Sequence, residues 1–349
     1  MQTFEEIRPG IRVATLPLPG KRPGPVNVYL FEGERNVLVD TGARQTAHLL
    51  KSIFRNSGFD LNNLDQIIAT HGHLDHFGAA AQLIRCSNKR ARLAAHPEDV
   101  PSILHRREAT FAAYVRYFGA TGVPILLRIL MLPLMFLGKY MAEPCPVDHL
   151  LNDGDKVRLG DYEAVVISTP GHTCGSICLY IQSEKILVAG DHILEHITPN
   201  ALVMLENNGS LPQRSSQMEY YRSLEKVLRL SPELVLTAHG KPVRDIGRVV
   251  DRYRESFGKR KERVLDIIGH EKKTVYRIAR ELFPELGGMS FPLDLFLALS
   301  EAYTHLQVLE KEGKIAMAME GRRLQVGCPD EKRIDPDVAL DRRALSGES

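Results

Sequence analysis

Residues 69–78 read ATHGHLDHFG and directly follow the apolar run LDQII at 64–68. Four potential ligands fall within six residues of this stretch, namely His71, His73, Asp75 and His76. Lone pairs of imidazole and carboxylate groups placed this close together converge on a metal, and such a set suits Zn, Fe, Mn or Ni. Because no cysteine is among them, the pattern argues against a closed structural zinc site.

Length and composition are those of an ordinary folded protein. The 349 residues include 44% hydrophobic and 25% charged side chains, as globular domains do. The formal net charge of +2 gives no general affinity for nucleic acid or for an anionic membrane. The five cysteines are widely spaced and fit reduced thiols, and the N-terminus lacks the pattern of a secretory signal. We therefore expect a cytoplasmic protein.

The segments around the histidine-rich stretch alternate between strand-like and helix-like patterns. Strands are expected at 11–16, 26–31, 36–39, 64–69, 91–95, 164–168, 176–181, 185–188 and 233–237. Helices are expected at 46–54, 75–86 and 217–230. This alternation is typical of a layered α/β domain.

Polar residues also stand at the ends of other predicted strands. Asp40 ends the strand at 36–39, and His172 lies in the turn TPGHT at 169–173. Asp191 follows in AGDH at 189–192, and His239 follows in AHG at 238–240. The glycines of these turns allow the backbones to converge, so the side chains are expected to share one cavity.

Residues 97–150 interrupt the alternation with amphipathic and apolar segments, including VPILLRILMLPLMFLGKYM at 123–141. Two prolines and two basic residues divide this segment, and its apolar runs are shorter than the roughly 20 residues of a membrane span. We expect no transmembrane segment but a helical insertion that packs on the catalytic face and lines an apolar pocket. A helical pair that only covers core is the main alternative, and contact with a membrane surface is a third.

After residue 250 the pattern changes. Helices are expected at 259–268, 274–283 and 291–311, with Thr274 as a possible N-cap, and a hairpin at 315–319 and 323–326. Three helices followed by a hairpin resemble a winged helix. The expected domains are therefore a catalytic domain over 1–250, a winged-helix-like domain over 251–328 and an irregular tail over 329–349.

The stretch HGHLDHFG matches the pattern H-x-H-x-D-H, and Asp40, His172, Asp191 and His239 follow in a fixed order around it. On these residues the chain resembles the metallo-β-lactamase superfamily over roughly 10–245. The resemblance implies an α/β fold, an αββα sandwich with metals at one edge of the sheets. The site is similar to those of the glyoxalase II, lactonase and RNase Z branches.

Carried over to this sequence, the resemblance implies a first metal held by His71, His73 and His172. It implies a second metal held by Asp75, His76 and His239, with Asp191 bridging the two. The expected cofactors are two divalent ions, zinc first, with iron or manganese as alternatives. Asp40 is expected to accept a hydrogen bond from a ligand imidazole and to fix its tautomer.

Such a site predicts hydrolysis. Two divalent ions lower the pKa of a bridging water, and the resulting hydroxide attacks an electrophilic carbonyl or phosphorus. Asp191 is the expected bridge, and Asp75 is expected to pass a proton to the leaving group. The predicted substrate is a small-molecule thioester, ester or lactone with a hydrophobic group.

Two other functions remain open on the sequence. The winged-helix-like region and the basic runs at 258–261 and 322–323 suit an endoribonuclease or nucleic-acid-binding protein, whereas the near-neutral charge and the apolar residues of 291–297 oppose this function. A di-iron redox protein is a third function that the ligand set would permit. The apolar C-terminal region also suggests a homodimer.

Candidate pocket residues come from two places. The insertion contributes four aromatic side chains, Tyr114, Tyr117, Phe118 and Tyr140, for which ordinary packing is the alternative. His192 and Asn200 follow Asp191 closely and are candidates for substrate contact. For His192, a surface position or support of the metal ligands is the alternative.

Overall fold

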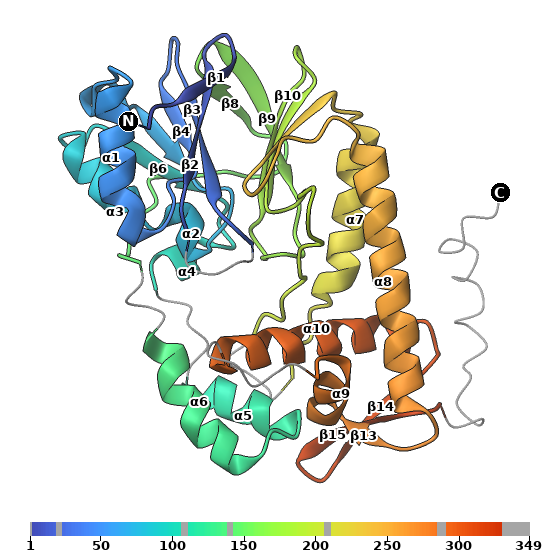
Figure 1. The fold of residues 1–349 in the computed structure, drawn as a ribbon. Coiled ribbons are helices and arrows are strands. Elements are labelled where there is room, and N and C mark those ends of the chain that lie inside the picture. The colour runs from blue at the N-terminus through green and yellow to red at the C-terminus, as the bar shows by residue number, and fades with distance from the viewer. Residues whose placement is uncertain are drawn as a thin grey trace.

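The computed structural model describes residues 2–18, 23–105, 111–137, 142–205, 211–284 and 291–329. Tyr140 and the tail predicted beyond residue 329 lie outside these ranges. Two central sheets and a small third sheet organise the described residues. Helices lie on both outer sides of the two central sheets, and further helices lie beyond one edge of them (Figure 1).

The first sheet has seven strands in the order of the sequence. They are β1 (Glu5–Arg8), β2 (Ile11–Leu16), β3 (Val26–Phe31), β4 (Val37–Val39), β5 (Gln66–Ile68), β6 (Arg92–Ala95) and β7 (His149–Leu150). Neighbours are antiparallel from β1 to β4 and parallel from β4 to β7. Every side chain of β3, β4 and β5 is buried, because both faces of the sheet are covered there.

The second sheet has five strands in the order β12, β11, β10, β9, β8. Their bounds are β8 (Lys156–Leu159), β9 (Tyr162–Ser168), β10 (Ile177–Ile181), β11 (Ile186–Gly190) and β12 (Leu234–Thr237). The pair β11–β12 is parallel and the others are antiparallel. The parallel strands of both sheets therefore bring their carboxyl ends to one edge of the sandwich.

Three groups of buried side chains establish the four layers. Residues such as Val39 and Val188 fill the space between the sheets. The helices α1 (Ala47–Asn56) and α3 (Ala80–Cys86) cover the outer face of the first sheet. The helices α7 (Ser216–Arg229) and α8 (Ile246–Ile268) cover the second. This αββα arrangement confirms the predicted fold class.

The helix predicted over 75–86 is wrong in its continuity. The structure has two helices instead, α2 (Leu74–Phe77) and α3, separated at Gly78 and Ala79. A Cβ atom at Gly78 would lie 2.1 Å from the Leu74 carbonyl oxygen and 2.8 Å from the Arg44 nitrogen. Only glycine fits where these backbones meet, and the chain changes direction there.

The C-terminal part contains the elements that the sequence predicts, in the same order. The helix predicted over 259–268 is the second half of α8, which runs through residue 250 without a break. After it come β13 (Lys273–Thr274), α9 (Val275–Leu282), α10 (Phe291–Lys311), β14 (Ala316–Glu320) and β15 (Arg323–Gly327). Thr274 caps α9, because its hydroxyl accepts a hydrogen bond from the Arg277 amide at 3.3 Å. We call α9, α10 and these three strands the C-terminal unit.

The insertion packs differently from our first expectation. Beyond the short helix α4 (Val100–Ile103) it forms α5 (Phe111–Ala120) and α6 (Ile125–Leu137). Tyr117 and Phe118 are buried in one cluster with side chains of α8, α9 and α10, and their rings lie 6.5 Å from that of Phe296. Tyr117 and Phe118 of α5 therefore pack against α8 and the C-terminal unit, whereas Ile103, Ala142 and Cys145 of the same insertion pack in the core of the first sheet.

One face of α6 is exposed and apolar, and it consists of Ile125, Leu126, Ile129 and Leu130. Their positions in the sequence place them side by side on the helix. Within the described residues, no helix combines the length and the apolar character needed to cross a membrane.

Buried histidine in α10 predicts a pH dependence of stability. His305 is 2% exposed, and burial followed by the charges of Arg260 and Lys261 lowers its pKa to about 3. The unfolded chain, with a histidine pKa near 6.5, therefore binds a proton that the folded chain rejects as pH falls below about 6.5. The free energy of unfolding falls with pH by up to about 1.4 kcal/mol per unit from this group.

The test is urea unfolding of EDTA-treated protein between pH 5 and 8. The slope of the free energy of unfolding against pH reports how many protons unfolding takes up. On the acid side we expect this number to be smaller by about one in His305→Leu than in the parent. His270→Gln, at an exposed position, should leave the curve unchanged. Equal slopes in the parent and in His305→Leu would refute the assignment.

Candidate metal centre

Five ends of strands and turns meet at the edge where the parallel strands end. Asp40 follows β4, and the stretch from His71 to His76 follows β5. His172 lies in the turn between β9 and β10, Asp191 follows β11, and His239 follows β12. The structure therefore brings the candidate ligands of distant segments together at one place, as expected for the carboxyl ends of strands in α/β folds.

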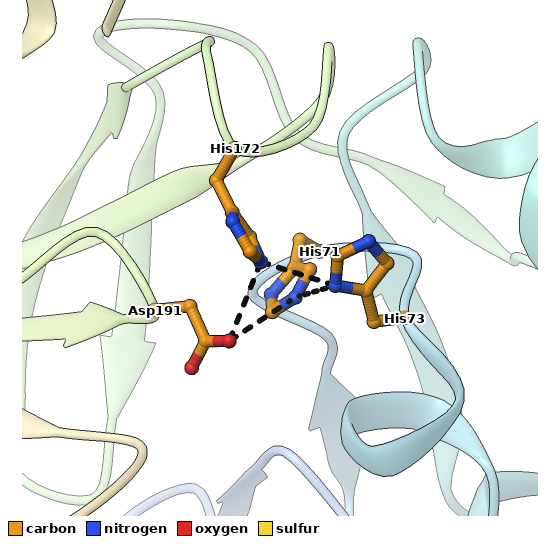
Figure 2. A group of neighbouring side chains, drawn as sticks. All are labelled: His71, His73, His172 and Asp191. Atoms are coloured by element: carbon orange, nitrogen blue, oxygen red, sulfur yellow. Dashed lines mark hydrogen bonds and ion pairs between the residues drawn. The ribbon is translucent and has the colours of Figure 1, made fainter. Parts of the chain in front are cut away.

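Three imidazoles and a carboxylate form a first group, His71, His73, His172 and Asp191. His73 Nδ1 lies 2.9 Å from His71 Nε2 and 3.1 Å from His172 Nε2. Asp191 Oδ2 lies 3.3 Å from His172 Nε2 and 3.9 Å from His71 Nε2. Figure 2 shows the rings and the carboxylate pointing toward one another.

A second group, Asp75, His76 and His239, lies beside the first. The Nε2 atoms of His76 and His239 lie 3.7 and 3.6 Å from the oxygens of Asp75. They also lie 3.6 and 3.3 Å from Asp191 Oδ1. Asp191 thus directs Oδ2 to the first group and Oδ1 to the second.

The outer nitrogens of four of these rings each lie beside an oxygen, and for His71 this is the Thr70 hydroxyl, 3.2 Å from Nδ1. His76 Nδ1 lies 2.7 Å from Asp40 Oδ2, and His172 and His239 each have Nδ1 2.9 Å from a backbone carbonyl, of Asn200 and Pro25. Carbonyl oxygens carry no proton, so His172 and His239 donate from Nδ1 and direct the Nε2 lone pair inward. Such outer contacts are those that orient histidine ligands in metal sites.

The position of Asp40 is costly and firmly held. Its φ angle of 59° is unusual for a residue other than glycine. Its carboxylate accepts hydrogen bonds from the Thr70 amide at 2.8 Å and the Thr70 hydroxyl at 2.9 Å, besides the contact with His76. The carboxylate is almost fully buried, and both of its oxygens accept hydrogen bonds. These bonds offset the strain of the backbone.

Unpartnered buried atoms provide the test of whether a cation fits. Within the described part of the chain, His76 Nε2, His239 Nε2 and Asp191 Oδ1 are buried and have no hydrogen-bond partner. A buried polar atom without a partner costs about 1–3 kcal/mol, so three at one point are expensive. Nitrogen and carboxylate oxygen are the donors that divalent transition metals bind, and the residues therefore fit such ions.

Burial and neighbouring charges set the ionisation of the group. Burial and adjacent imidazoles lower the pKa of His71 far below its usual value and that of His73 to about 3, which keeps both neutral. Burial opposes ionisation of Asp191, but His76 and His172 outweigh it and lower its pKa. Burial also opposes protonation of His76, yet Asp40, Asp191 and Asp75 raise its pKa. A cation among these carboxylates would take the place of that proton.

The remaining candidates from the sequence divide between the cluster around α10 and the surroundings of the centre. Tyr117 and Phe118 are buried in the cluster with α10, and Tyr114 packs against Phe118. His192 is 2% exposed, and its ring lies 5.0 Å from that of Tyr220 on α7. Asn200 does reach the centre, through its backbone carbonyl. Packing accounts for the described contacts of these aromatic residues, whereas both ring nitrogens of His192 are buried without a hydrogen-bond partner among the described residues.

Asp99 is a residue that the sequence reasoning missed. Its Oδ2 accepts hydrogen bonds from the Gly72 amide at 2.7 Å and the Thr173 hydroxyl at 2.6 Å, and Oδ1 accepts one from the Gly175 amide at 2.9 Å. This buried carboxylate joins the loop of His71 and His73 to the turn of His172. Its position four residues after a predicted strand was the available signal, since the other acidic site residues also follow strands.

Replacement of this carboxylate should weaken metal binding. In Asp99→Asn, an amide nitrogen faces a backbone N–H, so one of the two loops loses its acceptor. We expect zinc affinity, measured by competition with a chromophoric chelator, to fall about 10- to 100-fold. Asp153→Asn is the control, because Asp153 also accepts a backbone hydrogen bond, from Ser168, but contacts neither loop. Equal affinities of the two variants would refute the role of Asp99.

Comparison with known proteins gives a family match. The family model of the metallo-beta-lactamase superfamily matches residues 22–239. The chain is similar to the Bacillus subtilis (strain 168) protein named probable metallo-hydrolase YqjP, with 25% identity over 313 residues, 85% of this chain and 92% of the relative. It is also similar to the human protein named acyl-coenzyme A thioesterase MBLAC2, with 27% identity over 177 residues, 48% of this chain and 58% of the relative.

Solved structures support the same fold. A metallo-beta-lactamase family protein of Thermus thermophilus matches with a TM-score of 0.78 and 23% identity, over 93% of this chain and 100% of that chain. A beta-lactamase domain protein of Burkholderia ambifaria matches with a TM-score of 0.77 and 22% identity, over 93% and 94%. The chain belongs to the metallo-beta-lactamase superfamily, and its ligand-rich edge is the candidate site of a metal-dependent hydrolase.

Proposed function

We propose that this protein is a dinuclear metal-dependent hydrolase that cleaves small-molecule thioesters carrying an acyl chain or another hydrophobic group. Esters and lactones of the same kind are the nearest alternatives. The observation that carries the proposal is Asp191, whose two oxygens face two separate groups of ligands. A carboxylate between two such groups is the arrangement of a bridged pair of metals.

In this proposal His71, His73 and His172 hold one ion, and Asp75, His76 and His239 hold the other. Zinc is the first candidate, with iron or manganese as alternatives, because the donors are nitrogen and carboxylate oxygen. Divalent ions bound here would act as Lewis acids and lower the pKa of a water molecule. Neutral His71 and ionised Asp191 are already in the forms that bind cations.

Asp75 is the candidate for proton transfer. Its side chain is 25% exposed, whereas that of Asp191 is 8% exposed, so Asp75 is the acidic ligand that substrate can approach. We propose that one oxygen of Asp75 accepts the proton that the attacking water gives up and passes it to the leaving thiolate or alkoxide. Asp40, which is held by Thr70 and His76, is placed to orient the imidazole and not to touch substrate.

Two observations support a thioester with a hydrophobic group. The human and bovine relatives named acyl-coenzyme A thioesterase MBLAC2 share 27% identity with about half of this chain. The exposed apolar face of α6 offers contact area for an acyl chain, and α6 lies beyond the same edge of the sandwich as α2 (Figure 1). By contrast, Leu295, Leu299 and Leu306 of α10 are buried, which leaves these side chains unavailable to a nucleic-acid groove.

Metal analysis tests the dinuclear site. We expect about two zinc ions per chain in fully loaded protein and at most one in Asp191→Ala, because each group loses an oxygen. Turnover should fall roughly a hundredfold or more, because Asp191 is proposed to bind both ions. His196→Gln, an exposed histidine that hydrogen-bonds to Pro23, should keep both ions and full turnover. Full occupancy at one ion in the parent would exclude the dinuclear proposal.

Acyl-CoA hydrolysis tests the substrate. With Leu126→Glu and Ile129→Glu combined, we expect KM for a long-chain acyl-CoA to rise about tenfold, the loss of about 1.4 kcal/mol of apolar contact. KM for acetyl-CoA should not change. Leu150→Glu is the matched control, since Leu150 is exposed on the edge strand β7. A parent that hydrolyses lactones but no acyl-CoA would replace the thioester with the lactone alternative.

A further inference from the structure

One face of α10 is hydrogen-bonded to residues that follow the candidate metal centre in the chain, and by the segment we mean the described residues 199–205 and 211–214. The Ser300 hydroxyl accepts a hydrogen bond from the Val203 amide at 2.7 Å. The Tyr303 hydroxyl donates to the Pro212 carbonyl at 3.1 Å, and the Gln307 amide donates to the same carbonyl at 3.2 Å. Positions 300, 303 and 307 lie on one side of a helix, so the C-terminal unit holds this segment with a single face.

These contacts are buried and therefore resistant to rearrangement. Ser300 is fully buried, and Tyr303 and Gln307 are nearly so. Breaking such a bond would leave a buried donor without a partner, which costs about 1–3 kcal/mol. The Val203 side chain adds to the attachment, because it lies in the same apolar cluster as Leu299 of α10.

The same segment holds a histidine of the candidate centre. Three residues before Val203, the Asn200 carbonyl accepts the hydrogen bond from His172 Nδ1 at 2.9 Å. Residues 199–205 form no helix or strand. Within the described part of the chain, the bonds to His172 and to Ser300 are the hydrogen bonds of this stretch. Besides the packing of Ala201 on the second sheet, the attachment to α10 therefore helps to position the Asn200 carbonyl.

Arg214, at the other end of the segment, also connects α10 with residues near the centre. The Arg214 carbonyl accepts a hydrogen bond from the Gln307 amide at 3.4 Å. The Arg214 side chain pairs with Glu219 of α7 at 2.6 Å and with Glu98 at 3.3 Å. Glu98 directly precedes Asp99, the carboxylate that joins the two histidine-bearing loops. Both ends of the segment thus connect α10 with residues that support the candidate ligands.

We infer that α10 positions the metal centre, with Ser300 acting on His172 through Val203 and Asn200. Ser300, Tyr303 and Gln307 are positioning residues in this inference, and the C-terminal unit is a supporting part of the catalytic site. The inference rests on the proposed metal centre. It gives the unit a function that needs no partner macromolecule.

The experiment compares two hydroxyls of one helix. Ser300→Ala removes the bond to Val203. Thr304→Val removes a buried hydroxyl whose one hydrogen bond among the described residues lies within α10, to the Glu301 carbonyl. Zinc affinity is measured by chelator competition, and the absorption spectrum of the cobalt-loaded protein reports ligand geometry. We expect Ser300→Ala to bind zinc about tenfold more weakly and to alter the cobalt spectrum. Thr304→Val should stay within about twofold of the parent, because it removes no ligand support.

Tyr303→Phe provides a second variant that preserves shape. It removes one bond to Pro212, and we expect roughly a two- to fivefold loss of zinc affinity, less than a full ligand-support contact is worth. Urea unfolding of metal-free protein accompanies each measurement. If Ser300→Ala and Tyr303→Phe destabilise the metal-free fold but bind zinc as the parent does, α10 has a structural role alone and the inference fails. If the parent itself binds no zinc, the proposed function fails with it.

Discussion

A buried carboxylate that faces imidazoles on two sides is the constraint on which this structure depends. Almost no solvent reaches Asp191 and burial opposes its ionisation, but the neighbouring imidazoles of His76, His172 and His239 outweigh burial and lower its pKa. The turn that presents it requires Gly190, whose φ angle is 52° and where a Cβ atom would lie 2.7 Å from the Thr70 hydroxyl. The end of β11 can therefore approach the end of β5 closely enough to share ligands.

Because the ends of β11 and β5 lie close together, polar contacts link the two sheets in addition to their apolar packing. Thr70 binds Asp40 after β4, Asp40 binds His76, and His76 faces Asp191 from the other sheet. Asp99 adds a second link, from the loop after β6 to the turn of His172. A displacement of either sheet along the sandwich would break several of these buried bonds at once. The apolar layer between the sheets fixes their spacing, and this polar layer fixes their register at the site.

The sequence predicted the residues of the centre better than their support. The ligand pattern was readable because each donor stands beside a strand end in a recognisable turn, and the order of Asp40, His172, Asp191 and His239 carries the family resemblance. The family resemblance implied the αββα layers, and the periodicity of apolar residues predicted the bounds of α10. Asp99, the break at Gly78 and the packing of Tyr117 on the C-terminal unit were not predicted, because each depends on contacts between segments far apart in the chain.

The role of the C-terminal unit follows from the same distinction between ligands and support. A histidine ligand needs a fixed tautomer and ring orientation, and both are set by the partner of its outer nitrogen. For His76 that partner is Asp40, inside the first sheet, and for His239 it is the Pro25 carbonyl beside β3. For His172 it is the carbonyl of Asn200, in a stretch without regular structure. A carbonyl in such a stretch is positioned by the contacts of its neighbours, and here these are the packing of Ala201 on the second sheet and the hydrogen bond of Val203 to Ser300 of α10. The sandwich thus holds the outer partners of His76 and His239 by itself, whereas the outer partner of His172 lies in a stretch that is also bound to the C-terminal unit.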